Sequence, residues 1–175
     1  SNWKKILQNK FIKENDELIL LGKSLGSDFS PYFLQDQKIT SSICEFNELL
    51  TPDIDLEIKT AKFIQKAAET DLIQSANDIS RGGIFMSLIK MTQKNLGFSI
   101  DVNDEKDIFC EYSAGYILAI DQKNKEKVFS ILNKDQINFL SLGQIKLNTL
   151  EINTKKFNYS DILDMYYKNF YKLIN

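Results

Sequence analysis

One stretch decides the fold expected for this chain, and at residues 75–91 it reads SANDISRGGIFMSLIKM. Its second half carries apolar side chains at near-helical spacing: Ile84, Phe85, Leu88, Ile89 and Met91. Such spacing is typical of a helix with one buried face, so we predict a helix that packs against a sheet. We expect this face to be buried in one cluster with Leu118, which lies in an apolar run further along the chain.

The polar half of the stretch reads as a turn that leads into this helix. Asn77, Asp78 and Ser80 can accept hydrogen bonds from the free N–H groups of a helix start. The pair Gly82 and Gly83 permits a tight turn or a close approach of two backbones. A helix start of this kind can bind a phosphate. Because capped helices are far more common than phosphate sites, we interpret Asp78 as a helix cap before we interpret it as a ligand contact.

The composition is that of a globular chain of ordinary domain size. The chain has 175 residues, of which 43% are hydrophobic and 26% charged, so one domain over residues 1–175 can bury a core of its own. The net charge is −2 and Arg81 is the single arginine, which excludes the basic surface of a nucleic-acid binder. No apolar run approaches the ~18 residues of a membrane span, so we expect no membrane association and a cytoplasmic location.

The residues that the chain lacks limit its chemistry. It has no histidine, and Cys44 and Cys110 lie far apart without a CxxC motif. Zinc sites, disulfide frameworks and histidine-dependent catalytic triads are therefore poor interpretations. Catalysis here would have to depend on carboxylates, lysines, tyrosines or hydroxyl groups.

Apolar periodicity predicts an alternation of strands and helices. Strands are predicted at residues 17–22, 98–102, 116–120, 137–145 and 149–152, and helices at residues 53–70, 84–95, 124–134 and 159–173. We expect a glycine C-cap at Gly97, a hairpin turn at Leu147 and Asn148, and a cap on the last helix from Ser160 and Asp161. The fold class expected from this order is α+β, a mixed, largely antiparallel sheet covered by helices.

Residues 75–84 resemble the A-H-D-I-S-D-G-G-L signature of the synthetases related to aminoimidazole ribonucleotide (AIR) synthase. Further features resemble that family in the same order: a strand and Gly-Ser loop at residues 20–29, a helix start at Pro52 and Asp53, an E-S-x-G-R-like element at residues 111–115 and the sequence LGQI at residues 142–145. Within the superfamily, the ordered set is most similar to the last domain of the phosphoribosylformylglycinamidine (FGAM) synthase family. The resemblance covers nearly the whole chain.

The resemblance implies an AIR synthase C-terminal-domain-like fold in a fragment of a longer chain. The parent enzyme would be an ATP-dependent C–N ligase of de novo purine biosynthesis, which converts a formamide to an amidine with ammonia from glutamine. ATP and Mg²⁺ are implied as cofactors of the parent, with none expected in the isolated fragment. The implied partners are the remaining domains of the parent chain, a glutaminase subunit and a small accessory subunit.

Three departures from the family motifs affect the expected site. Asn77 stands where the family has histidine, Arg81 where it has a second aspartate, and Tyr116 where the E-S-x-G-R element ends in arginine. We therefore expect no catalytic residue in this fragment, which should be inactive alone, in a structural role or beside an auxiliary nucleotide site. The auxiliary nucleotide or phosphate contacts that the resemblance implies are Asp78, Ser80, Gly82, Gly83, Glu111 and Ser113, with Asp78 also as the metal ligand.

Two other interpretations stay open. The chain also resembles the C-terminal domains of thiamine-phosphate kinase, selenophosphate synthase and hydrogenase maturation proteins, which share the D-I-S-D-G-G-type element. A non-enzymatic protein-interaction module is the third interpretation. Because superfamily members pair two copies of this domain, we also expect the fragment to form a two-fold homodimer through residues 116–120 and the strand around Phe139.

Overall fold

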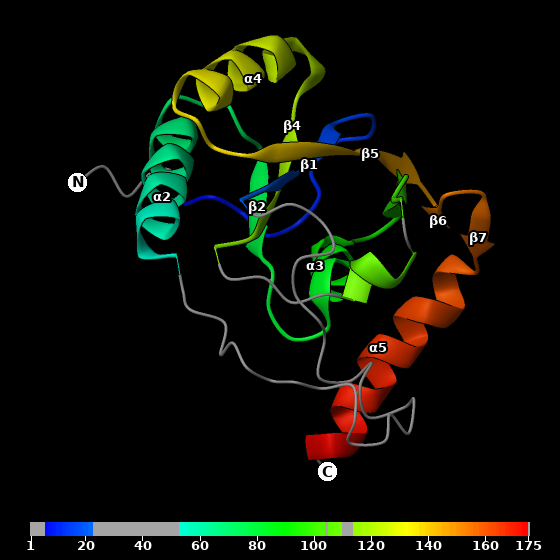
Figure 1. Ribbon diagram of the computed structural model, residues 1–175. Helices are drawn as coiled ribbons and strands as arrows, with labels where there is room; N and C mark the ends of the chain where they lie inside the picture. Colours follow the sequence, from blue (N-terminus) through cyan, green and yellow to red (C-terminus); the bar gives the residue numbers. More distant parts are fainter. Residues whose placement is uncertain (1–5, 23–52, 104, 110–113, 175) are drawn as a thin grey trace.

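The computed structural model describes residues 6–22, 53–103, 105–109 and 114–174. In these ranges seven strands form one sheet, in the order β2-β4-β1-β5-β3-β6-β7 (Figure 1). Their bounds are β1 Glu17–Leu21, β2 Ser75–Asp78, β3 Leu96–Ile100, β4 Tyr116–Ile120, β5 Phe139–Leu147, β6 Leu150–Ile152 and β7 Lys155–Phe157. Neighbouring strands are antiparallel except for β3 and β6, which are parallel. The predicted α+β class with a mixed, largely antiparallel sheet is confirmed.

Helices cover both faces of this sheet. They are α2 Ile54–Glu69, α3 Gly83–Met91, α4 Lys125–Lys134 and α5 Tyr159–Ile174, with short 3-10 helices η1 Glu105–Phe109 and η2 Gln122–Asn124. Helices α2 and α4 lie on one face, and α3 and α5 on the other (Figure 1). Each face has its own apolar cluster, so the sheet is the middle layer between two cores. Among the described residues, no helix is both long and apolar enough to cross a membrane.

Strand β4 shows how the sequence is divided between the two cores. Side chains alternate in direction along a strand, and Ile117 and Ala119 join the cluster under α3. Leu118 and Ile120 join the cluster under α2 and α4. The expectation that α3 and Leu118 share one cluster was therefore wrong, because Leu118 points to the opposite face of the sheet.

The strand at residues 116–120 does not supply the exposed apolar patch expected for a homodimer. The domain's own helices cover both of its faces, and residues 117–120 are buried. On β5, by contrast, Leu140 and Leu147 are 39% and 42% exposed. The homodimer itself stays a prediction, and β5 is the strand that could contribute to it.

Helix α3 ends earlier than the sequence predicts. It stops at Met91, and the hydroxyl of Thr92 donates to the carbonyl of Ile89 at 2.6 Å. The predicted C-cap, Gly97, lies instead in β3, where a Cβ atom would come within 2.0 Å of the carbonyl oxygen of Thr149. The glycine is needed there for close approach of the two backbones and not to end a helix.

The predicted hairpin between β5 and β6 is absent from the described sheet. Both strands pair with β3, β5 antiparallel on one side and β6 parallel on the other. Asn148 does form a turn, with φ of 47°, but this turn leads the chain to the far side of β3. The hairpin joins β6 to β7 through Asn153, which has φ of 56°.

Side chains cap the starts of α2 and α5. The carboxylate of Asp53 accepts a hydrogen bond from the N–H of the third residue of α2 at 2.9 Å, so Asp53 caps this helix. The sequence predicts the cap two residues earlier, at Thr51, which lies outside the described residues. At α5, Asn158 Oδ1 accepts hydrogen bonds from the N–H groups of Ser160 and Asp161, at 3.0 Å and 3.3 Å. The predicted cap by Ser160 and Asp161 was wrong, because these residues donate to the cap instead of forming it.

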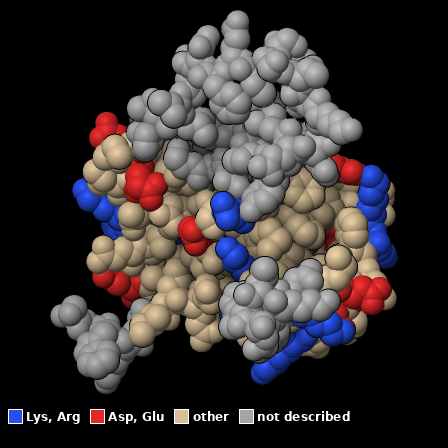
Figure 2. Space-filling view, turned by 90° about the horizontal axis from the view of Figure 1, so that it is seen from below, with Lys and Arg blue, Asp and Glu red and all other residues tan. Residues whose placement is uncertain are grey.

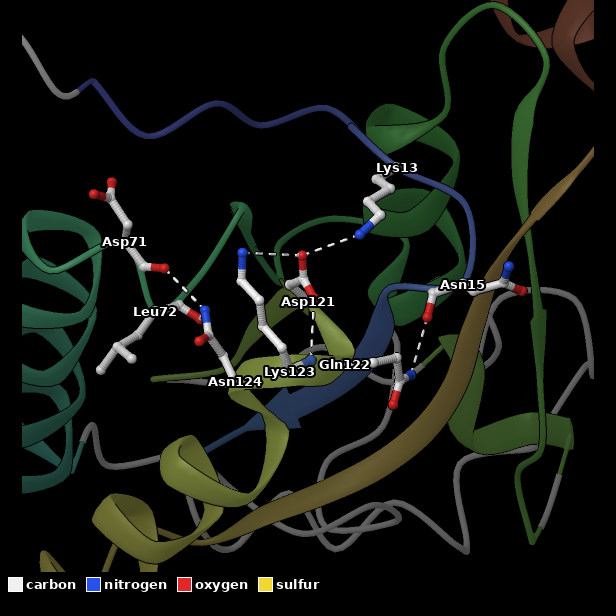
Figure 3. A network of polar contacts seen from close by, with 8 residues as sticks. All are labelled: Lys13, Asn15, Asp71, Leu72, Asp121, Gln122, Lys123 and Asn124. Carbon is white, nitrogen blue, oxygen red and sulfur yellow. Dashed lines mark hydrogen bonds and ion pairs between the residues drawn. The ribbon is translucent and has the colours of Figure 1, made fainter.

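Residues 79–83, which link β2 to α3, form the central turn. A network of polar contacts holds the end of the sheet that lies away from this turn (Figure 3). Asp121, directly after β4, accepts a hydrogen bond from Lys13 Nζ at 3.1 Å and lies 3.6 Å from Lys123 Nζ. Two side-chain amides of η2 donate hydrogen bonds to the backbone of earlier segments. Gln122 donates to the carbonyl of Asn15, and Asn124 donates to the carbonyls of Asp71 and Leu72. The network ties the chain before β1 to the turn after β4.

Asp16 is a buried acid beside this network, and it makes stability depend on pH. Asp16 is 1% exposed. Burial and the charge of Asp121 raise its pKa to about 6, although the charges of Lys13 and Lys123 oppose this shift. Because the folded-state pKa exceeds the unfolded value of ~3.9, the folded chain holds this proton more tightly. The contribution of Asp16 to stability is therefore full below about pH 4 and is lost as the pH rises through about 6.

Asp16→Asn is expected to remove this loss of stability. Urea midpoints measured below and above the titration window, for the parent and the variant, test the expectation. The exposed Asp101→Asn is the control, and its midpoints should follow those of the parent. An Asp16→Asn variant with the parent's pH dependence would contradict the assignment.

Candidate functional site

The central turn begins at the end of β2, an edge strand of the sheet. Asp78, the last residue of β2, lies opposite Tyr116 of β4, and the N–H of Ile79 donates to the carbonyl of Gly115 at 2.8 Å. The first four residues of the stretch at 75–91 therefore form a strand and not the predicted turn. Sequence reasoning missed this strand because it contains no large apolar side chain, and pairing with β4 holds it in place.

Two glycines shape the turn itself. Gly82 and Gly83 have φ of 86° and 67°, and the N–H of Gly83 donates to the carbonyl of Ser80 at 2.9 Å. A Cβ atom on Gly82 would come within 2.3 Å of Cγ of Met86. Since the Met86 side chain is flexible, the positive φ is the stronger reason for glycine at this position.

The predicted side-chain caps are wrong. Helix α3 begins after Gly82, and no side chain forms a capping hydrogen bond there. Instead, Asn77 Nδ2 and the hydroxyl of Ser87 both donate to the carbonyl of Asp78, at 2.9 Å and 2.8 Å. These side chains fix the exit of β2 relative to α3, so the polar residues of the stretch stabilise the turn and do not cap the helix.

The structure brings four of the six predicted contacts together. The side chain of Asp78 is exposed at the end of β2, and Ser80 is half-buried, with its hydroxyl 3.4 Å from Lys90 Nζ. Gly82 and Gly83 present the helix start next to them. Glu111 and Ser113 lie outside the described residues.

An acidic residue of α2 completes the described part of the site. Tyr116 donates its hydroxyl hydrogen to Glu57 Oε1 at 2.7 Å. Burial, the hydrogen bond to Glu57 and the charges of Glu57 and Asp78 together raise the pKa of Tyr116 to about 12. The position where the family motif carries arginine is thus a neutral phenol already bonded to a carboxylate, which is less favourable for an anion. Along the chain, Glu57 belongs to the polar side of its helix, so the sequence alone did not indicate this contact.

A metal ion at this site would depend on ligands beyond the described side chains. Asp78 is an oxygen donor of the kind that Mg²⁺ prefers. Across the described ranges, no group of three or more His, Cys, Asp or Glu side chains is placed to share a metal ion. The arrangement fits a single carboxylate that contacts a metal held mainly by phosphate and water.

Charge is mixed on the face seen from below. Figure 2 shows Lys and Arg side chains interspersed with Asp and Glu side chains around uncharged surface, and the visible described part carries no extended basic field. This agrees with the net charge of −2.

The fold and the central turn are those of one protein family. The family model "AIR synthase related protein, C-terminal domain" matches residues 13–147. The chain therefore belongs to the family of AIR synthase related C-terminal domains.

The similar proteins place it next to one branch of that family. Phosphoribosylformylglycinamidine synthase subunit PurL of Campylobacter jejuni strain 81-176 is 30% identical over 160 residues, which cover 85% of this chain and 21% of PurL. The crystal structure of phosphoribosylformylglycinamidine synthase II from Thermotoga maritima matches with a TM-score of 0.72 at 11% identity, over 91% of this chain and 28% of that chain. Thiamine-monophosphate kinase from Stenotrophomonas maltophilia matches with a TM-score of 0.57 at 10% identity, over 90% of this chain and 56% of that chain.

The two structural matches show a shared fold. The chain spans between a fifth and a quarter of the length of the curated PurL relatives that it matches. Thermotoga maritima PurL has also been solved in complex with ATP and with FGAR.

Proposed function

We propose that this chain is the C-terminal domain of an FGAM synthase of de novo purine biosynthesis, one domain over residues 1–175 in a longer protein. The observation that carries the proposal is the 30% identity to PurL over 85% of this chain. The kinase fold supports the alternative less well, because its TM-score is 0.57 against 0.72 for the synthase.

The parent enzyme would be an ATP-dependent C–N ligase. ATP would activate the formamide oxygen of FGAR, the formylglycinamide substrate, as a phosphate ester. Ammonia from glutamine would then displace the phosphate to give the amidine. Mg²⁺ would accompany the ATP, a glutaminase subunit would supply the ammonia, and a small accessory subunit would join the assembly. The structure of PurLQS from Thermotoga maritima supports a complex of several subunits. The proposed location is the cytoplasm.

Within the parent, this domain would have a structural role or border an auxiliary nucleotide site. A phosphate would lie at the start of α3, where Gly82 and Gly83 allow the backbone to approach it closely, with the hydroxyl of Ser80 as a donor. Asp78 would contact the accompanying Mg²⁺, and Glu111 and Ser113 would complete the set. The neutral Tyr116, bonded to Glu57, and the single described carboxylate at the turn favour an auxiliary site over a catalytic one.

The purified chain alone is expected neither to hydrolyse ATP nor to consume FGAR, because its sequence has no histidine and no Walker-type glycine-rich loop. Phosphate release and FGAR consumption measure this directly. Turnover that disappears in Asp78→Ala would mean that the domain is catalytic and that the auxiliary role is wrong.

A titration with Mg-ADP separates the structural role from the auxiliary site. If the turn binds a nucleotide, amide resonances of residues 78–83 should shift on addition of Mg-ADP. In Asp78→Ala, the part of the shift that depends on Mg²⁺ should disappear. Unchanged resonances would restrict the domain to a structural role.

A further inference from the structure

A groove lies between α2 and α4, on the face of the sheet opposite to α3. Its volume is about 390 Å³. Its floor is apolar and consists of Phe63, Ala67, Leu72, Ile131 and Ile137. These residues belong to the cluster under α2 and α4 or pack against it, so the groove is the place where this core reaches the surface.

Lysines surround this floor. Lys59, Lys62 and Lys66 follow one another on one side of α2 at helical spacing, and Lys127 faces them from α4. All four side chains are exposed, and none forms an ion pair with the described part of the chain. Among the residues that line the groove, Asp135 alone is acidic.

This concentration of like charge stands out in a chain whose net charge is −2. Positive charges one helical turn apart repel one another, and among the residues that line the groove only Asp135 carries a negative charge. A partner that brings carboxylates would remove the repulsion and cover the apolar floor in the same step. We propose that the groove binds an acidic segment of a partner protein, which inserts an apolar side chain between α2 and α4 and places carboxylates against the four lysines.

The distribution of polar groups favours a protein segment over a small anionic ligand. Small-molecule sites hold a few fixed polar groups among apolar walls. Here the ammonium groups are on long exposed side chains at the rim, and the hydroxyl of Thr70 donates to the carbonyl of Lys66 at 2.8 Å. An apolar centre inside a polar rim is the anatomy of a protein interface, and the lysine stems extend the apolar area. The proposal is independent of the enzyme to which the domain belongs.

The test uses the full 175-residue chain and a short synthetic peptide in which glutamates flank a central Leu-Phe pair. The peptide should shift amide resonances on α2 and α4 and leave those of α3 and α5 unchanged. Fluorescence anisotropy of the labelled peptide should show that Lys62→Glu combined with Lys66→Glu weakens binding by ~10-fold or more, because two attractions become repulsions. The matched control, Lys94→Glu combined with Lys156→Glu, has the same net charge as this double variant. It should bind the peptide as tightly as the unmodified chain does.

A second peptide, with alanines in place of the Leu-Phe pair, tests the floor of the groove and should bind at least several-fold more weakly. Equal affinity for the two peptides would mean nonspecific charge attraction and would overturn the proposal. Equal weakening by both double variants, or no binding of the first peptide, would also overturn it. ADP that produces the same resonance shifts as the peptide would assign the groove to a small anion instead. Unchanged thermal midpoints show that each variant is folded.

Discussion

Leu88→Ala is expected to lower the free energy of unfolding by about 2–5 kcal/mol, the range for large-to-small substitutions at fully buried positions. Leu88 is 0% exposed and lies in the apolar cluster between α3 and the sheet. The same cluster includes Ile117 of β4, whose side chain is also fully buried. Because backbone elements surround the site, it cannot collapse fully around the cavity that the alanine leaves.

Urea unfolding of the parent and the variant measures the loss. Met165→Ala is the control, since Met165 on α5 is 61% exposed and its truncation should change stability by less than ~0.5 kcal/mol. A loss at Leu88 as small as that of the control would mean that α3 does not pack on the sheet as described.

Gly143→Ala is expected to have a comparable effect, about 2–6 kcal/mol, from backbone strain and overpacking together. Gly143 has φ of 148°, and a Cβ atom there would come within 2.1 Å of the carbonyl oxygen of Ser99. In the pairing of β1 with β5, Leu18 lies opposite Gly143 and Ile19 opposite Ser141, so Leu142 is the extra residue of a bulge. The glycine therefore permits the bulge and the approach of β3 at the same point.

The neighbouring Gln144→Ala provides the control for this strand, because its half-exposed side chain can be removed without strain. Chemical denaturation or differential scanning calorimetry compares the two variants. A Gly143→Ala variant as stable as Gln144→Ala would refute the assignment of strain. The bulge also gives a physical reason for the glycine in the sequence LGQI at residues 142–145.

The elements predicted best are those whose local pattern and tertiary environment agree. The runs at residues 17–21 and 116–120 are dense in apolar residues, and both are strands buried against helices on the two faces of the sheet. Helix α4 was predicted to within one residue, with Val128 and Leu132 buried as its periodicity requires.

Elements held by pairing alone were missed. Strand β2 reads SAND and carries no apolar pattern, so its conformation depends on hydrogen bonds to β4. The hairpin of β6 and β7 was also missed, although Asn153 gave a usable signal, since asparagine tolerates the positive φ of a two-residue turn. Asn148 and Asn153 both follow short apolar runs, so the sequence alone did not show which of them marks the hairpin.

The candidate site was predictable only where it is local in sequence. The central turn and its glycines are adjacent along the chain, and the structure keeps them together. The contact between Glu57 and Tyr116 joins residues 59 positions apart, and no sequence period links them. This contact changes the electrostatics of the site, since it places a neutral, hydrogen-bonded phenol where the family motif has a cation.

The central claim is that this domain is the C-terminal part of an FGAM synthase, and the protein encoded by the complete reading frame tests it most directly. Purified with FGAR, ATP, Mg²⁺ and ammonium as the nitrogen source, that protein should consume FGAR and release ADP together with the amidine product. A protein that leaves FGAR unchanged and phosphorylates thiamine phosphate, or a reading frame that ends with this domain alone, would contradict the account.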